Sequence, residues 1–375
     1  MSGAAGRHEV LVTGVGLHGA HGGGPATLAA LRAGRSAVAP FRTPEADGFP
    51  EVAAAPAAPW ALDDLVPDRK LQKYMSRAAS LAVLAAGRAL RDAGLLADAE
   101  RKADVALFVA TGLIGFELDQ VTQAMSVSGE GLGGDRMARG LALCHPLMPF
   151  RMLLNMPLGL VSIAYGLRGE NAILYPGPLQ GGVALRMAFD AVASGRAPRA
   201  LAGGSVHGLA LMPLATAWRA GRLARSPEAA AHRDGAGGLA AADASAFVLL
   251  ESRAAASARG ARARAVLSDV RAEPQDGAPA PRRGPPPGLV LASGSVDART
   301  DEADRGLAVE AGAPEAALLR VDPLAGHAGA AAPATAAALA ALALAAPDGP
   351  ARALAVARDP EGGAVLADLA AEARA

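Results

Sequence analysis

Apolar residues follow two patterns along this chain: short continuous runs, and longer stretches in which they recur with helical spacing. The short runs predict strands at residues 9–13, 105–110, 171–175, 200–203 and 246–250. The longer stretches predict helices at residues 68–94 and 180–194, the first with Gly94 at the place of a helix C-cap. This alternation of strands and helices is typical of an α/β protein.

A second, smaller series of elements follows residue 251. It comprises an alanine-rich connector at 254–264, a strand at 265–270, helices at 301–312 and 327–346, and a last strand at 353–356. Residues 273–288 are dense in Pro, Gly and Arg, which predicts an exposed loop with little regular structure. We therefore expect two α/β halves, residues 1–255 and 256–375, of which the second is shorter.

Composition narrows the range of functions. The 375 residues include 36 Lys and Arg and 36 Asp and Glu, so the basic excess of a nucleic-acid-binding protein is missing and no such partner is expected. One cysteine, Cys144, leaves no internal disulfide and no cysteine-rich metal cage. The first residues lack the pattern of a signal peptide. The alanine-rich stretch 328–346 contains Pro333 and is interpreted as a buried helix, not a membrane span. These features predict a cytoplasmic protein.

One glycine motif resembles a cofactor site. Gly14, Gly16 and Gly19 form GxGxxG directly after a predicted strand. A dinucleotide site also needs an acidic residue about twenty positions later, and the first acid after the motif is Glu45. A tight strand-to-helix turn is therefore the favoured interpretation, and no cofactor is expected.

Two further pairs of residues invite chemical interpretations. Cys144 and His145 are adjacent, but neighbours in sequence do not face each other on a helix, so a packed or half-exposed thiol is favoured. His18 and His21 have no Cys or carboxylate nearby that would complete a metal site. No bound metal is expected.

Seven longer stretches carry a family resemblance through their order and spacing. They are VLVTGVGLHGAHG (10–22), LRAGRSAV (31–38), DRKLQKYMSRAASLAVLAAGRALRDAGL (68–95), NMPLGLVSIAYGLRGEN (155–171), LAGGS (201–205), FVLLE (247–251) and DPLAGHAGAAAPA (322–334). Together they resemble the β-ketoacyl-acyl-carrier-protein synthase family, over about Val10 to Leu344. The resemblance implies a thiolase-like fold, with two related α/β halves in a five-layered α-β-α-β-α arrangement and a shortened second half.

The resemblance also locates the family's reactive groups, most of which are replaced here. The nucleophilic cysteine falls on Pro178, the first histidine on Ser293 and the lysine on Asp322, while the second histidine is retained as His327. Ketosynthesis needs a thiolate to carry the acyl chain and imidazole donors to stabilise the enolate. No catalytic residue is therefore expected, and His327 is interpreted as a structural remnant.

Two smaller family features are altered as well. Asp243 takes the place of the glutamate in the family's Gly-Glu-Gly-Ala segment, and the glycine-rich C-terminal loop is reduced to residues 359–363. The segment that the family carries between Val270 and Leu289 is trimmed, which leaves open whether a closed internal acyl pocket remains.

What the resemblance implies is a chain length factor of a type II polyketide synthase. Such a subunit forms a heterodimer with a catalytic ketosynthase, walls one end of its acyl tunnel and meets an acyl carrier protein that carries the growing chain. The interface is expected to include Asn155, Met156, Asn171, Ile173 and Tyr175.

The depth of the tunnel is expected to be set by residues 112–125, interpreted as a tunnel-lining helix. The candidates are Leu113, Phe116, Gln120 and Thr122, for which ordinary interface packing is an equally favoured interpretation. Two other functions stay open: an acyltransferase or hydrolase that uses His327 with Ser293 or Cys144, and a structural homodimeric scaffold without an acyl substrate.

Overall fold

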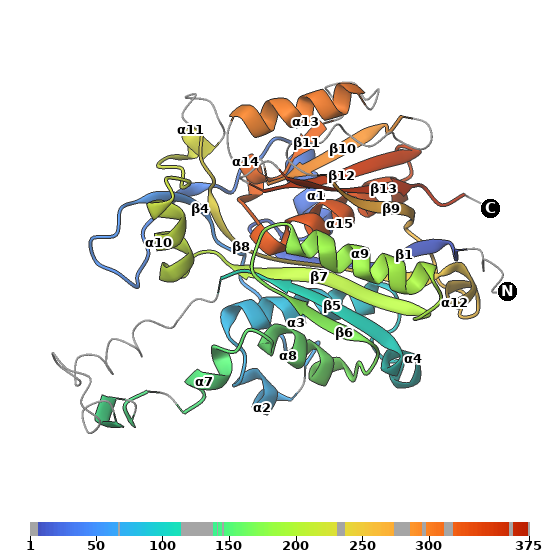
Figure 1. Ribbon diagram of the computed structural model, residues 1–375, viewed down its shortest axis with the longest axis horizontal. Coiled ribbons are helices and arrows are strands. Elements are labelled where there is room, and N and C mark those ends of the chain that lie inside the picture. Colours follow the sequence, from blue (N-terminus) through green and yellow to red (C-terminus); the bar gives the residue numbers. More distant parts are fainter. Residues whose placement is uncertain are drawn as a thin grey trace.

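The computed structural model describes residues 7–66, 68–113, 138–140, 142–144, 146–230, 237–273, 286–294, 298–310, 318–359 and 363–373. Two sheets and three layers of helices alternate through the molecule (Figure 1). The predicted arrangement of five layers, α-β-α-β-α, is therefore confirmed.

The two halves share one strand order. In space, the N-terminal sheet runs β6 (Asn171–Leu174), β5 (Val105–Thr111), β7 (Arg199–His207), β8 (Ala241–Ser252) and β1 (Val10–Gly19). The C-terminal sheet runs β11 (Leu318–Arg320), β10 (Leu289–Ser293), β12 (Arg352–Arg358), β13 (Ala364–Ala370) and β9 (Ala265–Glu273). In each sheet the fourth strand, β8 or β13, runs antiparallel to the other four, which are parallel to one another. The sheets join where β1 pairs with β9.

The middle layer consists of α1 (Gly24–Arg32), α9 (Gln180–Ala193) and α15 (Ala332–Ala345). Helices α9 and α15 pack with the inner faces of both sheets in one apolar core. Helix α15 consists of Ala and Leu apart from Pro333 and Thr335, and it is buried almost throughout. It therefore lacks the polar face that an amphipathic surface helix has. Within the described ranges, no helix has the length and apolar character needed to cross a membrane.

The outer layers differ in extent. Helices α3 (Arg77–Asp92) and α8 (Met156–Tyr165) cover the N-terminal sheet, whereas α13 (Ala298–Glu310) packs on the C-terminal sheet. Residues 20–104 separate β1 from β5, but only residues 274–288 separate the corresponding strands β9 and β10. The second half is therefore shortened, as the sequence predicts.

The remaining elements are short. They are β2 (Gly22–Gly23), β3 (Ala39–Phe41), β4 (Val52–Ala55), α2 (Arg69–Gln72), α4 (Ala99–Ala103), α7 (Met148–Arg151), α10 (Leu211–Arg219), α11 (Pro227–Ala230), α12 (Arg253–Ser257), α14 (Asp322–Ala325) and the 3-10 helix η2 (Gly329–Ala331).

Two sequence predictions about the N-terminal half are wrong. Residues 68–94 form two helices, because the Ser76 side chain accepts a hydrogen bond from Ala79 N (3.3 Å) and starts α3 anew. The GxGxxG glycines lie inside β1, not in a strand-to-helix turn. A Cβ on Gly16 would lie 1.9 Å from the Ala85 carbonyl oxygen, so the motif lets α3 approach the strand closely.

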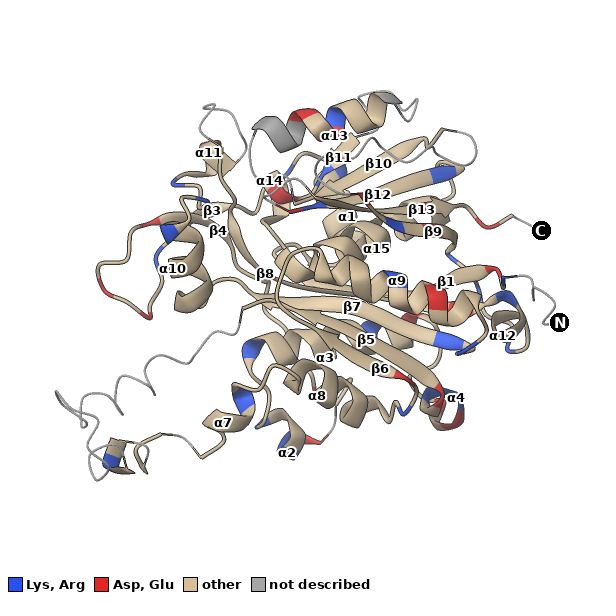
Figure 2. Cartoon of the chain, viewed as in Figure 1, with Lys and Arg blue, Asp and Glu red and all other residues tan. Residues whose placement is uncertain are grey.

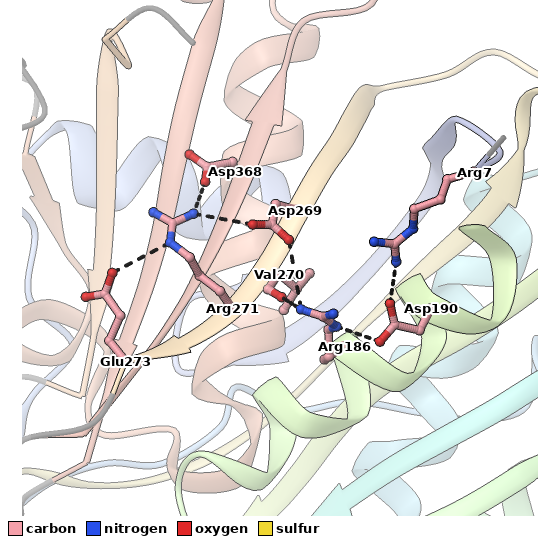
Figure 3. A network of polar contacts seen from close by, with 8 residues as sticks. All are labelled: Arg7, Arg186, Asp190, Asp269, Val270, Arg271, Glu273 and Asp368. Atoms are coloured by element: carbon pink, nitrogen blue, oxygen red, sulfur yellow. Dashed lines mark hydrogen bonds and ion pairs between the residues drawn. The ribbon is translucent and has the colours of Figure 1, made fainter. Parts of the chain in front are cut away.

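A polar network links the middle layer to the C-terminal sheet (Figure 3). On α9, Arg186 Nε donates to Asp190 Oδ2 at 2.6 Å, and the same guanidinium lies 3.9 Å from Asp269 of β9. Arg271, also on β9, forms an ion pair with Asp368 of β13. These contacts tie a helix of the first half to strands of the second.

Candidate functional site

A cavity of about 370 Å³, called the site cavity below, is lined by the segments that lead into α9 and α15. Pro178 and His327 both line it, as does Leu113. The other lining residues are almost all apolar or glycine: Gly112, Pro176, Gly177, Val206, Gly208, Pro213, Leu214, Thr216, Ala217, Ala220, Arg222, Leu223, Leu239, Ala241, Ala242, Gly329 and Ala330. The fold thus brings the end of the β6–α9 connection and the start of the α15 region to one apolar space.

His327 is held in place by a carboxylate. Its Nδ1 lies 2.9 Å from Asp322 Oδ1, and because an ionised carboxylate only accepts, Nδ1 is the nitrogen that donates. The other carboxylate oxygen, Oδ2, accepts from Gly294 N at 2.6 Å, and the Asp322 side chain is only 3% exposed. Gly326, with a φ of +78°, makes the turn from α14 to His327.

Ser293, which the sequence resemblance assigns to the family's first histidine, is the last residue of β10. It is fully buried, and its Oγ has no hydrogen-bond partner within the described part of the chain. The hydroxyl does not line the site cavity, although its neighbour Gly294 donates to Asp322. Pro178, Asp322 and His327 therefore surround or support one cavity, and Ser293 lies behind it.

Pro178 offers two kinds of catalytic group fewer than another residue could at the wall of the site cavity: no nucleophilic side chain and no backbone donor. Its side chain has no nucleophilic atom, and its ring nitrogen carries no backbone N–H to donate to an oxyanion. It lies in the turn before α9, which begins at Gln180 with Leu179 as its N-cap. The thiolate chemistry of a condensing enzyme has no starting group at this position.

A second cavity of about 250 Å³, called the polar cavity below, lies on the other side of the end of β7. Val206 and Gly208 line the site cavity, whereas His207 lines the polar cavity, as expected for alternating side chains of a strand. Leu113 lines both cavities.

Asp243 organises the charged groups of the polar cavity. Its Oδ1 lies 2.7 Å from His207 Nδ1, and its Oδ2 accepts from Arg77 Nε at 2.6 Å. Burial alone would raise the pKa of Asp243, but the hydrogen bonds and charges of His207 and Arg77 together hold it below its usual range. The Arg77 guanidinium also lies 4.7 Å above the Trp60 ring centre, in cation–π contact.

The edge of the N-terminal sheet carries an apolar surface. Strand β6 ends the strand order, and within the described residues β5 is the one strand that pairs with it. Of the ten large hydrophobic side chains exposed in the described chain, seven fall within residues 143–183: Leu143, Phe150, Leu153, Leu154, Ile163, Tyr175 and Val183. We call β6, together with Ile163 of the covering helix α8 and Tyr175 directly after the strand, the edge face.

The predicted interface residues belong to these elements. Asn155 is the exposed N-cap residue of α8, and Met156 begins that helix. Asn171 and Ile173 lie on β6, and Tyr175 follows it with 37% of its surface exposed.

Other candidate residues lie elsewhere. Phe116, Gln120 and Thr122 fall outside the described residues. Cys144 donates its thiol to Gly140 O at 3.8 Å and lines neither cavity. Among the residues that the structure describes, no group of three His, Cys, Asp or Glu side chains could hold a metal ion.

Comparison with known proteins gives a family match for the first two thirds of the chain. Residues 7–256 match the family model of the β-ketoacyl synthase N-terminal domain. Nodulation protein E of a Rhizobium species is 30% identical over 263 residues, covering 70% of this chain and 62% of that protein. The 3-oxoacyl-[acyl-carrier-protein] synthase 2 of a Synechocystis species is 29% identical over 138 residues, covering 37% of this chain and 31% of that protein. The chain thus spans less than two thirds of the length of these relatives.

Two solved structures share the fold over nearly the whole chain. The ishigamide ketosynthase/chain length factor aligns with a TM-score of 0.77 at 20% identity, covering 98% of this chain and 100% of that one. A type II polyketide synthase acyl-carrier protein in complex with its ketosynthase bound to the hexaketide aligns with a TM-score of 0.78 at 19% identity, again over 98% and 100%. At this identity the likeness shows the fold.

Proposed function

Because the chain belongs to the β-ketoacyl synthase family, we propose that it is a chain length factor of a type II polyketide synthase. In this role it condenses nothing itself. It forms a heterodimer with a catalytic ketosynthase and supplies part of the wall of the partner's acyl tunnel. The carrier protein brings the growing chain to the partner's cysteine.

The observation that carries this proposal is that the site cavity is present but contains no nucleophilic side chain beside His327. Pro178, which the resemblance assigns to the family's cysteine, lines the site cavity together with His327, and no lining residue carries a thiol. Ser293 and Cys144, the alternative nucleophiles, line neither cavity. Loss of the covalent step with retention of the fold is what a supporting subunit requires.

The edge face supports the choice of a partner chain. An unpaired strand edge is a template for another strand, and clustered exposed apolar side chains mark protein interaction sites. The α8 and β6 sequences contain no charged residue (Figure 2), so a partner could bury them without stranding a charge. We assign this face to the ketosynthase, with Asn155, Met156, Asn171, Ile173 and Tyr175 within the interface.

The polar cavity is the proposed extension of the partner's tunnel. Leu153 and Leu154, which precede α8, and Pro157 in its first turn line it, beside the edge face. Leu113 closes it on the side of the site cavity. A growing chain that crosses the interface here would meet Leu113 before it could reach the site cavity.

The test is reconstitution with an intact ketosynthase. Co-expression should give a stable 1:1 complex that condenses malonyl units delivered by a carrier protein. Replacing the partner's cysteine by alanine should abolish condensation, whereas Pro178→Ala in this chain should retain it. Condensation by this chain alone would refute the proposal, and a homodimer that binds no carrier protein would favour the scaffold alternative.

A further inference from the structure

We propose that the Asp322–His327 pair is a general base that hydrolyses thioesters of apolar acyl chains bound in the site cavity. This activity is separate from condensation and goes beyond the chain length factor role.

The orientation of the imidazole is the first step of the argument. His327 Nδ1 donates a hydrogen bond to Asp322 Oδ1 at 2.9 Å. Gly294 N donates to the other carboxylate oxygen, Oδ2, at 2.6 Å and holds the Asp322 side chain in place. In the neutral ring Nε2 then carries the lone pair, and within the described residues it has no hydrogen-bond partner. A buried carboxylate that fixes the tautomer and stabilises the imidazolium is the arrangement by which an Asp makes a His an effective base.

The surroundings of His327 indicate the nucleophile. Thr216 and Arg222 are the other polar side chains among the residues that line the site cavity. The Thr216 hydroxyl already donates to Met212 O at 2.8 Å. No side-chain nucleophile is therefore placed beside the base, and the group that Nε2 can activate is water.

The walls of the site cavity indicate the substrate. Leucine, valine, proline and alanine side chains surround the base, so an apolar acyl chain is favoured over a sugar or a peptide. A single general base supplies about 10²–10⁴-fold acceleration. That range suits an activated acyl group such as a thioester better than an amide.

The step balances without a cofactor. Water loses a proton to His327 Nε2 as its oxygen bonds to the thioester carbonyl carbon, forming a tetrahedral intermediate. Collapse of the intermediate breaks the C–S bond, and the imidazolium returns the proton to the departing sulfur. The products are a carboxylic acid and a thiol.

The experiment uses the purified full chain and hexanoyl-N-acetylcysteamine, with thiol release followed spectrophotometrically. We expect saturable hydrolysis above the buffer rate, and His327→Ala and His327→Gln should each lower kcat at least 100-fold. Asp322→Asn keeps the size of the side chain but loses its charge, so it should lower kcat roughly tenfold and leave KM unchanged. His8→Ala, at an exposed position far from the cavity, should retain full activity.

Several outcomes would overturn the inference: no release above buffer, equal rates for wild type and both His327 variants, or a loss in Asp322→Asn that appears only in KM. Thermal unfolding of each variant separates a chemical loss from an unfolded protein, and Gln at 327 covers the case in which Ala unfolds the chain. Complex formation with the ketosynthase is measured separately. Absence of hydrolysis with an intact complex therefore leaves the chain length factor role standing.

Discussion

The two halves of the molecule share a strand order but finish their sheets differently. Among the described residues each sheet ends in an edge strand with a single partner, β6 in the N-terminal half and β11 in the C-terminal half, and neither β6 nor α8 contains a charged residue. In the C-terminal half, the outer helix α13 exposes Glu302 and Arg305, and β11 ends in Arg320. Figure 2 shows the contrast between the two helices. One architecture thus provides one edge suited to a partner chain and one suited to water.

The two inner helices differ in the same way at their first turns. The connection into α9 ends in Pro178, with no reactive group, while the approach to α15 carries His327 and its supporting Asp322. The half in which Pro178 stands before the inner helix is the half that presents the edge face. This coincidence is what a subunit specialised for assembly would show.

The largest expected effect comes from a charge placed on the edge face. Ile163 on α8 is 68% exposed, and Ile163→Asp would bury an unpaired carboxylate in the proposed heterodimer, at a cost of about 4 kcal/mol. Affinity for the ketosynthase should fall roughly a thousandfold, measured by calorimetry or surface plasmon resonance.

The second half offers a matched control for that substitution. Val309 lies on the corresponding helix α13 and is 70% exposed, so Val309→Asp makes the same chemical change at equal exposure. It should bind the ketosynthase as the wild type does. Equal loss from both variants would remove the distinction between the two edges.

The next effect concerns how closely each outer helix packs against its sheet. Gly16→Ala would drive a methyl group to within 1.9 Å of the Ala85 carbonyl oxygen and should lower the free energy of unfolding by about 3 kcal/mol. Gly306→Ala on α13 meets nothing within 4 Å and should stabilise the helix by about 0.5–1 kcal/mol. Urea unfolding of both variants measures the difference, and similar values would argue against close seating in the first half alone.

A smaller effect is expected on the product of the reconstituted complex. Leu113→Ala removes the side chain shared by the two cavities, so the proposed tunnel should deepen and the products should gain one or two extension units. Met212→Ala truncates an exposed residue that lines neither cavity and should leave the distribution unchanged. Mass spectrometry measures the chain lengths of the products. An unaltered distribution for Leu113→Ala would mean that another residue forms the end of the tunnel.

The smallest effect is a dependence of the stability of the N-terminal half on pH. Burial, followed by the positive charges of Arg88 and Arg77, lowers the pKa of His18 below 6.5, although its hydrogen bond to Ala58 O opposes the shift. The unfolded chain then binds a proton that the folded chain does not, so stability falls as pH drops below about 6.5. Hydrogen exchange should show faster opening of β1 at pH 5.5 than at pH 7, with little change in β10 and β12. His18→Gln should flatten the response, and a persistent slope would assign it to another group.

Much of the fold could be predicted from sequence where a strand or helix carries a clear apolar pattern. Residues 105–110, 171–175 and 180–194 match β5, β6 and α9 closely. Strands β10, β11 and β13 were not predicted, since short Ala- and Leu-rich runs do not distinguish strand from helix. The break before α3 can be predicted from Ser76, because serine is a preferred N-cap residue and here interrupts an otherwise helical pattern.

The site was predictable only where residues are close along the chain. Asp322 and His327 are five residues apart, but their contact needs the turn at Gly326, and only that turn shows that the carboxylate holds the ring. The pairing of His207 with Asp243 depends on the register of β7 against β8, which no local pattern fixes.

The most direct test of the central claim is the intact mass of each subunit after the co-purified complex has been incubated with an acyl donor. The account predicts an acyl adduct on the catalytic ketosynthase and an unmodified mass for this chain. A covalent acyl adduct on this chain, in the absence of any on its partner, would contradict it.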